Sequence, residues 1–200
     1  MTIKQDIESY FLPYKDLMKT NGISFEGSDF HSMIDENAFW FSQITPFLKK
    51  DGIRVLEIGS GSGILLSFLA KSFPNITFEG IEPFLSGHDH WKEMSKKIDN
   101  VEIYNTDIES FIPEEKYDLI FSINVLEHVP KWKEYIHKSH ELLLPRGKNI
   151  VLCPDHHLPY ESHYIIPIII NKRITKLIFQ KIIERYEKKN MAIGHFDALN

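Results

Sequence analysis

Five residues in the first half of the chain have the types and spacing of a ligand-binding turn: Glu57, Gly59, Ser60, Gly61 and Gly63. They follow an apolar run and precede a stretch with helical periodicity. Glycine lets the backbone turn sharply and lets a ligand come close to it. The helix N-terminus that follows favours polar or anionic groups of a ligand. This segment is therefore predicted to bind a cofactor.

The spacing of the glycines separates two classes of cofactor. Dinucleotide-binding turns have the pattern G-x-G-x-x-G. Counted from Gly59, the last glycine of that pattern falls on Ile64, and counted from Gly61 it falls on Leu66. Glu57, at the end of the preceding run, suits a ligand with a cationic amino-acid portion and no pyrophosphate. An NAD-dependent oxidoreductase is therefore the less favoured alternative.

The elements that must position this turn alternate along the chain. Strands are predicted at 53–58, 76–81, 101–104, 117–123 and 149–153, and helices at 64–73, 86–98 and 130–144. A turn is predicted at 145–147, from proline and glycine. This alternation predicts an α/β fold, a Rossmann-like, doubly wound and mostly parallel sheet with helices on both faces. Helical periodicity at 3–19 and 31–49 predicts an N-terminal helical extension. The last two strands that would complete such a sheet are not found.

A second carboxylate, Glu82, ends the second predicted strand. An acid about 20 residues beyond the glycines accepts hydrogen bonds from ribose hydroxyls in related nucleotide-binding sheets. With the pattern E-x-G-x-G-x-G from Glu57, residues 50–155 resemble the class I S-adenosylmethionine-dependent methyltransferases. The resemblance implies S-adenosylmethionine as cofactor and S-adenosylhomocysteine as product. It implies that the glycine turn packs against the methionine and ribose portions, with Glu82 and Pro83 at the ribose and Asp107 and Ile108 at the adenine.

After the fourth strand, Asn124 and Val125 are predicted to contact the cofactor, and they lead into the sequence L-E-H-V. This stretch is similar to the methyltransferase type 11/12-like branch, whose members act on small molecules, and it implies that the strand end lies beside the reactive methyl group. His128, in the same stretch, titrates near neutrality and suits a general base or an orienting group. It can instead cap or anchor the helix that follows.

Further candidate bases lie in a polar segment after the fifth strand: His156, His157, Glu161 and His163. Ligands of such sheets bind at the carboxyl ends of the strands, so this segment is predicted to contact the acceptor, with plain loop packing as the alternative. Cys153 with these histidines does not have a recognised zinc-ligand spacing, and no metal is predicted. A short resemblance in this segment to methyltransferases of sugar pathways adds sugars and natural products to the small-molecule acceptors considered.

Composition limits the class of protein and the compartment that the sequence suits. The chain has 200 residues, a formal charge of -5 and one cysteine, which argues against a general nucleic-acid binder and fits a cytoplasmic protein. We expect one domain in three parts: an N-terminal cap at 1–50 that helps close the pocket, a cofactor-binding core at 51–155, and an acceptor-side segment at 156–200. A basic amphipathic helix at 168–189 suits packing on its own domain, or contact with a membrane surface or a partner. A non-catalytic cofactor-binding protein remains the second alternative, and the oligomeric state is left open.

Overall fold

A computed structural model describes residues 2–16, 28–83, 97–153, 160–161 and 166–188. The expected helix at 86–98 lies almost wholly outside the described residues, as do His156, His157 and His163. The described chain divides into two compact units, one of residues 1–122 and 133–151 and the other of residues 123–132 and 152–200. Each unit is described by itself.

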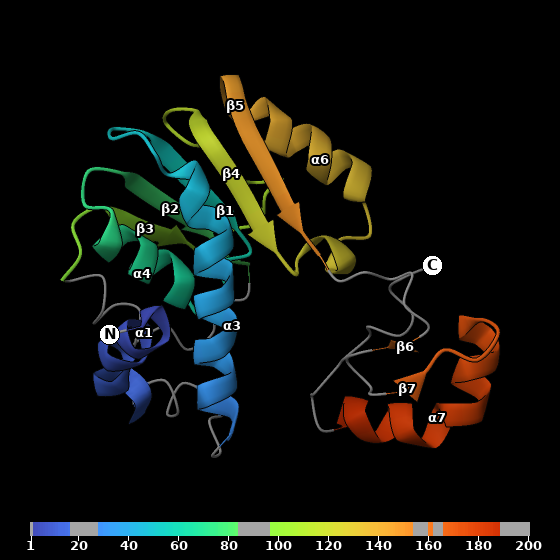
Figure 1. The fold of residues 1–200 in the computed structure, drawn as a ribbon. Coiled ribbons are helices and arrows are strands. Elements are labelled where there is room, and N and C mark those ends of the chain that lie inside the picture. The colour runs from blue at the N-terminus through green and yellow to red at the C-terminus, as the bar shows by residue number, and fades with distance from the viewer. Residues whose placement is uncertain (1, 17–27, 84–96, 154–159, 162–165, 189–200) are drawn as a thin grey trace. The chain divides into compact units, whose positions relative to one another are not determined.

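The first unit is built on a five-stranded sheet with the order β3-β2-β1-β4-β5. Its strands are β1 (Arg54–Ile58), β2 (Thr77–Ile81), β3 (Val101–Tyr104), β4 (Tyr117–Ile123) and β5 (Leu143–Leu152). The pairs of β1 with β2 and β4, and of β2 with β3, are parallel. Figure 1 shows the strands side by side in this order. The predicted Rossmann-like sheet is confirmed.

The helix over Ile64–Ser72 packs on this sheet, and nearly all of its residues are buried. The first unit contains α1 (Ile3–Phe11), η1 (Leu12–Tyr14), α3 (Ser28–Ile44), η2 (Thr45–Phe47), α4 (Ile64–Ser72) and α6 (Trp132–Glu141, whose first residue is counted with the second unit). α1, α3 and α4 gather together, and α6 lies beside β5 (Figure 1). The ring of Phe68 on α4 lies 5.8 Å from Tyr10 of α1 and 5.2 Å from Phe41 of α3. The predicted N-terminal helices therefore pack on α4.

β5 differs from the prediction. It begins at Leu143, six residues before the expected strand, and takes in the segment that was expected to form a turn. Tyr117 N–H donates to the carbonyl of Leu142 and Asn124 N–H to that of Leu152, so β5 uses more residues than β4 over the same span. Arg146, with a φ of 71°, takes up part of the excess length. β5 is an edge strand of the described sheet, and an edge tolerates a proline and an irregular backbone.

The second unit contains η3 (Leu126–His128), a short antiparallel pair of β6 (Tyr160–Glu161) and β7 (Ile166–Pro167), and α7 (Lys172–Lys188). α7 confirms the helix expected at 168–189, with a break in helical geometry at Phe179. Ile183 on α7 is buried, whereas Leu177 is 76% exposed. Contact of this helix with a membrane surface or a partner stays a prediction. Among the described helices, none has the length and apolar character needed to cross a bilayer.

Candidate cofactor site

The glycine turn joins β1 to α4 and has the left-handed backbone that its sequence predicts. Gly59, Gly61 and Gly63 have φ angles of 74°, 52° and 72°, a region that side chains other than glycine rarely adopt. The amides of Gly59 and Ser60 both donate to the carbonyl of Ile81, at 2.8 and 3.1 Å. These bonds fix the turn against the end of β2. Gly63 is the N-cap of α4 and its carbonyl accepts from Ser67 N–H.

Two glycines matter for what lies next to this turn: Gly61 leaves one side open, and Gly80 allows close packing on the other. A Cβ placed on Gly61 meets no atom within 4 Å, so the exposed side of the turn is open to a ligand. Below the turn, a Cβ on Gly80 of β2 would lie 2.8 Å from Leu66 Cδ2 and 2.9 Å from Ser60 Oγ. Gly80 therefore lets the turn and α4 lie directly on the sheet. It was not predicted, although a glycine inside a strand is a known sign of close backbone approach.

Glu57 lies beneath the turn near the end of β1 and is only 5% exposed. Its Oε2 atom is buried without a hydrogen-bond partner among the described residues. Burial, and to a smaller extent the charge of Glu82, raise the pKa of Glu57 from 4.5 to about 8. A buried acid without a partner is unfavourable unless a ligand supplies one. Glu57 is therefore suited to receive a cationic group. Ser60 Oγ is likewise buried and unpartnered among the described residues.

Glu82 joins the glycine turn to the ends of two neighbouring strands. Its Oε2 atom accepts a hydrogen bond from Gly61 N–H at 2.9 Å. Its own N–H donates to the carbonyl of Tyr104 at 3.0 Å. The half-buried Glu82 is followed by Pro83, which is exposed. The charge of Glu82 contributes to the raised pKa of Glu57. The structure thus brings the two predicted acids of the cofactor site near each other.

Asp107 follows β3, the next strand toward the sheet edge. Its Oδ1 atom accepts a hydrogen bond from Ser110 N–H at 2.7 Å, and the bonds to Ser110 lower the pKa of this exposed carboxyl. The carboxylate therefore stays ionised and can accept a further donor. Ile108, which was expected to contact the adenine ring, is 5% exposed. Its contact with a cofactor stays a prediction.

The second unit contains the predicted cofactor contacts Asn124 and Val125 and the candidate bases His128 and Glu161. Asn124 has a φ of 54°, and its N–H donates to the carbonyl of Leu152 at 2.8 Å. Val125 precedes η3, and the exposed His128 ends it, with its N–H bonded to the carbonyl of Val125. Glu161 lies in β6, where it pairs with Ile166. The described residues contain no group of three His, Cys, Asp or Glu side chains placed to hold a metal.

Two polar residues near the end of β4 were not predicted. Ser122 is 1% exposed and Glu127 is 5% exposed. The hydroxyl of Ser122 and both carboxylate oxygens of Glu127 are buried without hydrogen-bond partners among the described residues. A charged residue this buried is rare without a partner. The sequence signal was available, because Glu127 lies within the L-E-H-V stretch, but only the structure shows that it is buried.

Comparison with known proteins identifies the family. A family model described as a methyltransferase domain matches residues 31–175, and the chain belongs to this family. The fold is that of the class I S-adenosylmethionine-dependent methyltransferases, as the sequence motifs predicted. The crystal structure of coclaurine N-methyltransferase, bound to N-methylheliamine and S-adenosylhomocysteine, superposes with a TM-score of 0.53. The two chains are 24% identical, and the match covers 57% of this chain and 35% of the coclaurine N-methyltransferase chain.

Two curated relatives have higher identity. An uncharacterized protein of Mycobacterium tuberculosis (strain ATCC 25618 / H37Rv) is 31% identical over 154 residues, which are 74% of this chain and 52% of that protein. The (S)-coclaurine N-methyltransferase of Papaver somniferum is 30% identical over 134 residues, which are 65% of this chain and 37% of that enzyme. The chain thus spans about half the length of these relatives, or less.

Proposed function

We propose that this chain binds S-adenosylmethionine at the glycine turn and transfers its methyl group to a small-molecule acceptor. The observation that carries the proposal is Glu57, a buried acid just before an open glycine turn, with an oxygen that has no partner among the described residues. The amino-acid portion of S-adenosylmethionine has an ammonium group, which is the kind of partner that Glu57 lacks. A pyrophosphate supplies no cationic partner for Glu57 and would oppose the ionisation of this acid, which disfavours NAD.

The other predicted residues are assigned to the remaining parts of the cofactor. Glu82 uses Oε2 to hold Gly61 N–H, and its second oxygen is assigned to a ribose hydroxyl. The ionised Asp107 is assigned to the adenine amino group. When bound, S-adenosylmethionine supplies an electrophilic methyl group on a sulfonium. The protein has to hold the acceptor in line with that group and exclude water.

An amine is the acceptor class that we favour among small molecules. Glu127 is a buried carboxylate whose two oxygens lack partners among the described residues, and such a group suits a protonated amine. An amine is nucleophilic only after it loses its proton, so a base is required. Glu127 is assigned to hold the protonated amine. Its neighbour His128 is assigned to accept the proton. The name of the relative from Papaver somniferum, an N-methyltransferase, agrees with this choice, while sugars and other natural products remain acceptors to test.

Calorimetric titration tests the cofactor assignment. We expect micromolar binding of S-adenosylmethionine and S-adenosylhomocysteine and none of NAD, with Glu82→Ala weakening the binding by more than twofold. Binding of NAD alone would show that the site has been assigned to the wrong cofactor.

An acceptor screen then tests the reaction. Secondary amines, phenols and amino sugars are supplied with S-adenosylmethionine, and S-adenosylhomocysteine formation is followed. We expect amines to be methylated, and Glu127→Gln to abolish turnover while cofactor affinity is retained. Cofactor binding without turnover of any acceptor would instead support a non-catalytic binding protein.

A further inference from the structure

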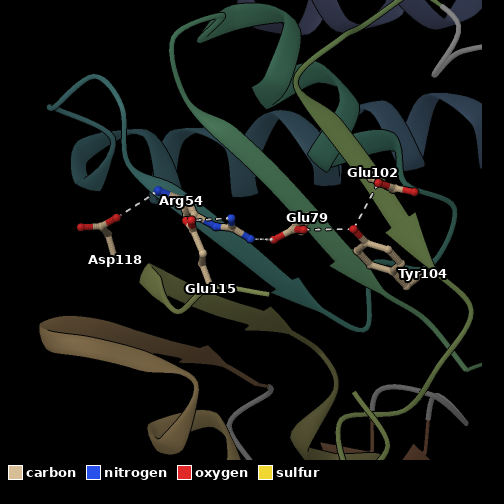
Figure 2. Close-up of polar contacts among 6 residues, drawn as sticks. All are labelled: Arg54, Glu79, Glu102, Tyr104, Glu115 and Asp118. Atoms are coloured by element: carbon tan, nitrogen blue, oxygen red, sulfur yellow. Dashed lines mark hydrogen bonds and ion pairs between the residues drawn. The ribbon is translucent and has the colours of Figure 1, made fainter. Parts of the chain in front are cut away.

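A line of polar side chains crosses the sheet from β1 to β3 (Figure 2). Arg54 Nη2 on β1 lies 2.7 Å from Glu79 Oε2 on β2. The other oxygen of Glu79, Oε1, accepts a hydrogen bond from the hydroxyl of Tyr104 on β3 at 3.0 Å. The Arg54 and Glu79 side chains are only 23% and 13% exposed. Solvent therefore screens this pair much less than a surface ion pair.

The Tyr104 side chain is held from several sides. Its hydroxyl also lies 3.1 Å from Glu102 Oε2, a second acceptor on the same strand (Figure 2). Burial, and then Glu79, raise the pKa of Tyr104, so the hydroxyl remains a donor at neutral pH. The ring of Phe111 packs against that of Tyr104, with 5.5 Å between their centroids. The ring position is thus fixed by both charge and packing.

The backbone of Tyr104 holds two of the loops assigned to the cofactor. Its carbonyl accepts hydrogen bonds from the N–H of Glu82 at 3.0 Å and from the N–H of Thr106 at 3.1 Å. Glu82 in turn holds the glycine turn through Gly61 N–H. Thr106 precedes Asp107, the residue assigned to the adenine. Tyr104 therefore joins Glu82, which is assigned to the ribose, to the segment of Asp107, which is assigned to the adenine.

We propose that Tyr104 is a positioning residue for the cofactor, and that the Arg54–Glu79 pair acts through it to set the spacing of Glu82 and Asp107. The proposal rests on the proposed function, because it concerns the same cofactor site. If the Tyr104 hydroxyl is removed, the carboxylates of Glu79 and Glu102 face one another with no hydrogen-bond donor from Tyr104 between them. Repulsion between these carboxylates would then displace the end of β3 and both loops that its carbonyl holds.

Two carboxylates on the same guanidinium provide a matched pair of variants. Glu79 and Glu115 both form ion pairs with Arg54, but of the two only Glu79 is bonded to Tyr104 in the described contacts. We expect Tyr104→Phe to weaken S-adenosylhomocysteine binding by about five- to tenfold, the size of effect that loss of one part-buried hydrogen bond has. Glu79→Gln loses the ion pair with Arg54 but keeps an oxygen that can accept from Tyr104, so its loss of affinity should be smaller. Glu115→Gln should leave the affinity unchanged.

A double-mutant cycle distinguishes positioning from general destabilisation. Because the Tyr104 carbonyl holds both Glu82 and Thr106, the loss caused by Tyr104→Phe should become smaller, without disappearing, in a Glu82→Gln background. All titrations are made well below the melting temperature of each variant. Losses that multiply in the double variant, or Tyr104→Phe with the affinity of the unaltered protein, would overturn the proposal.

Amide hydrogen exchange in the ligand-free protein separates this inference from the proposed function. We expect the amides of Glu82 and Thr106 to exchange at least about fivefold faster in Tyr104→Phe than in the unaltered protein, and at the same rate in Glu115→Gln. Unchanged exchange in Tyr104→Phe would refute the positioning role whatever the protein binds. Faster exchange in a protein that binds no S-adenosylhomocysteine would instead remove only the cofactor assignment.

Discussion

We expect S-adenosylhomocysteine binding at pH 7 to release about 0.8 proton from the protein, through ionisation of Glu57. This residue is fully buried, and its pKa is raised to about 8 by burial and by Glu82. At pH 7 about nine-tenths of the ligand-free protein then has a neutral Glu57. An ammonium group in contact with the carboxyl lowers its pKa by about two units. Most Glu57 side chains consequently become ionised when the ligand binds.

The number of protons is measured by calorimetric titration in buffers with different ionisation enthalpies, such as phosphate and Tris. The slope of the binding enthalpy against the buffer enthalpy gives the protons exchanged. Glu57→Gln is the matched variant, since it keeps the shape of the side chain and cannot ionise, and its slope should be near zero. At pH 9 the slope should also vanish, because Glu57 is already ionised before binding. A slope at pH 7 that is zero, or that is the same in Glu57→Gln, would show that Glu57 does not receive the ammonium group.

Four further expectations concern the same part of the molecule. Gly80→Ala places a methyl group 2.8 Å from Leu66 Cδ2 and should cost about 2 kcal/mol by overpacking, seen as a melting temperature about 4–8 °C lower. Gly61→Ala, with only its φ of 52° to oppose it, should cost about 1 kcal/mol. In the ligand-free protein, the raised pKa of Glu57 means that stability falls as pH rises from about 5 to 8, by up to about 4 kcal/mol in urea unfolding; Glu57→Gln should remove this slope. Asp107→Ala should weaken S-adenosylhomocysteine binding about fivefold, measured by titration, with little change in melting temperature.

Three of these expectations would be contradicted by a specific outcome. A Gly80→Ala protein as stable as the unaltered one would mean that α4 is not packed tightly on β2. Stability of the ligand-free protein that rises between pH 5 and 8 would contradict a neutral Glu57. Equal affinity in Asp107→Ala would remove this residue from the cofactor site and leave it as a turn residue bonded to Ser110.

The cofactor turn was predictable because its conformation depends on local sequence. Gly59, Gly61 and Gly63 all have positive φ angles, and only glycine adopts them without strain. The strands at 53–58, 76–81 and 117–123 were placed closely for a similar reason, since the mostly buried strands of a parallel sheet are apolar runs. The turn expected at 145–147 was wrong, because an edge strand accommodates proline and glycine that would end a central one.

The sequence by itself determined the order of the elements, the glycine turn and the acids that follow successive strands. These features follow from backbone conformation and from hydrophobic periodicity, and both are properties of neighbouring residues. Only the tertiary structure decided which polar groups are buried without partners among the described residues, as oxygens of Glu57 and Glu127 are. It also decided that Gly80 lies under Ser60, and that the Tyr104 carbonyl holds two loops at once. Burial and long-range hydrogen bonds depend on what the rest of the chain places around a residue, and no local pattern records that.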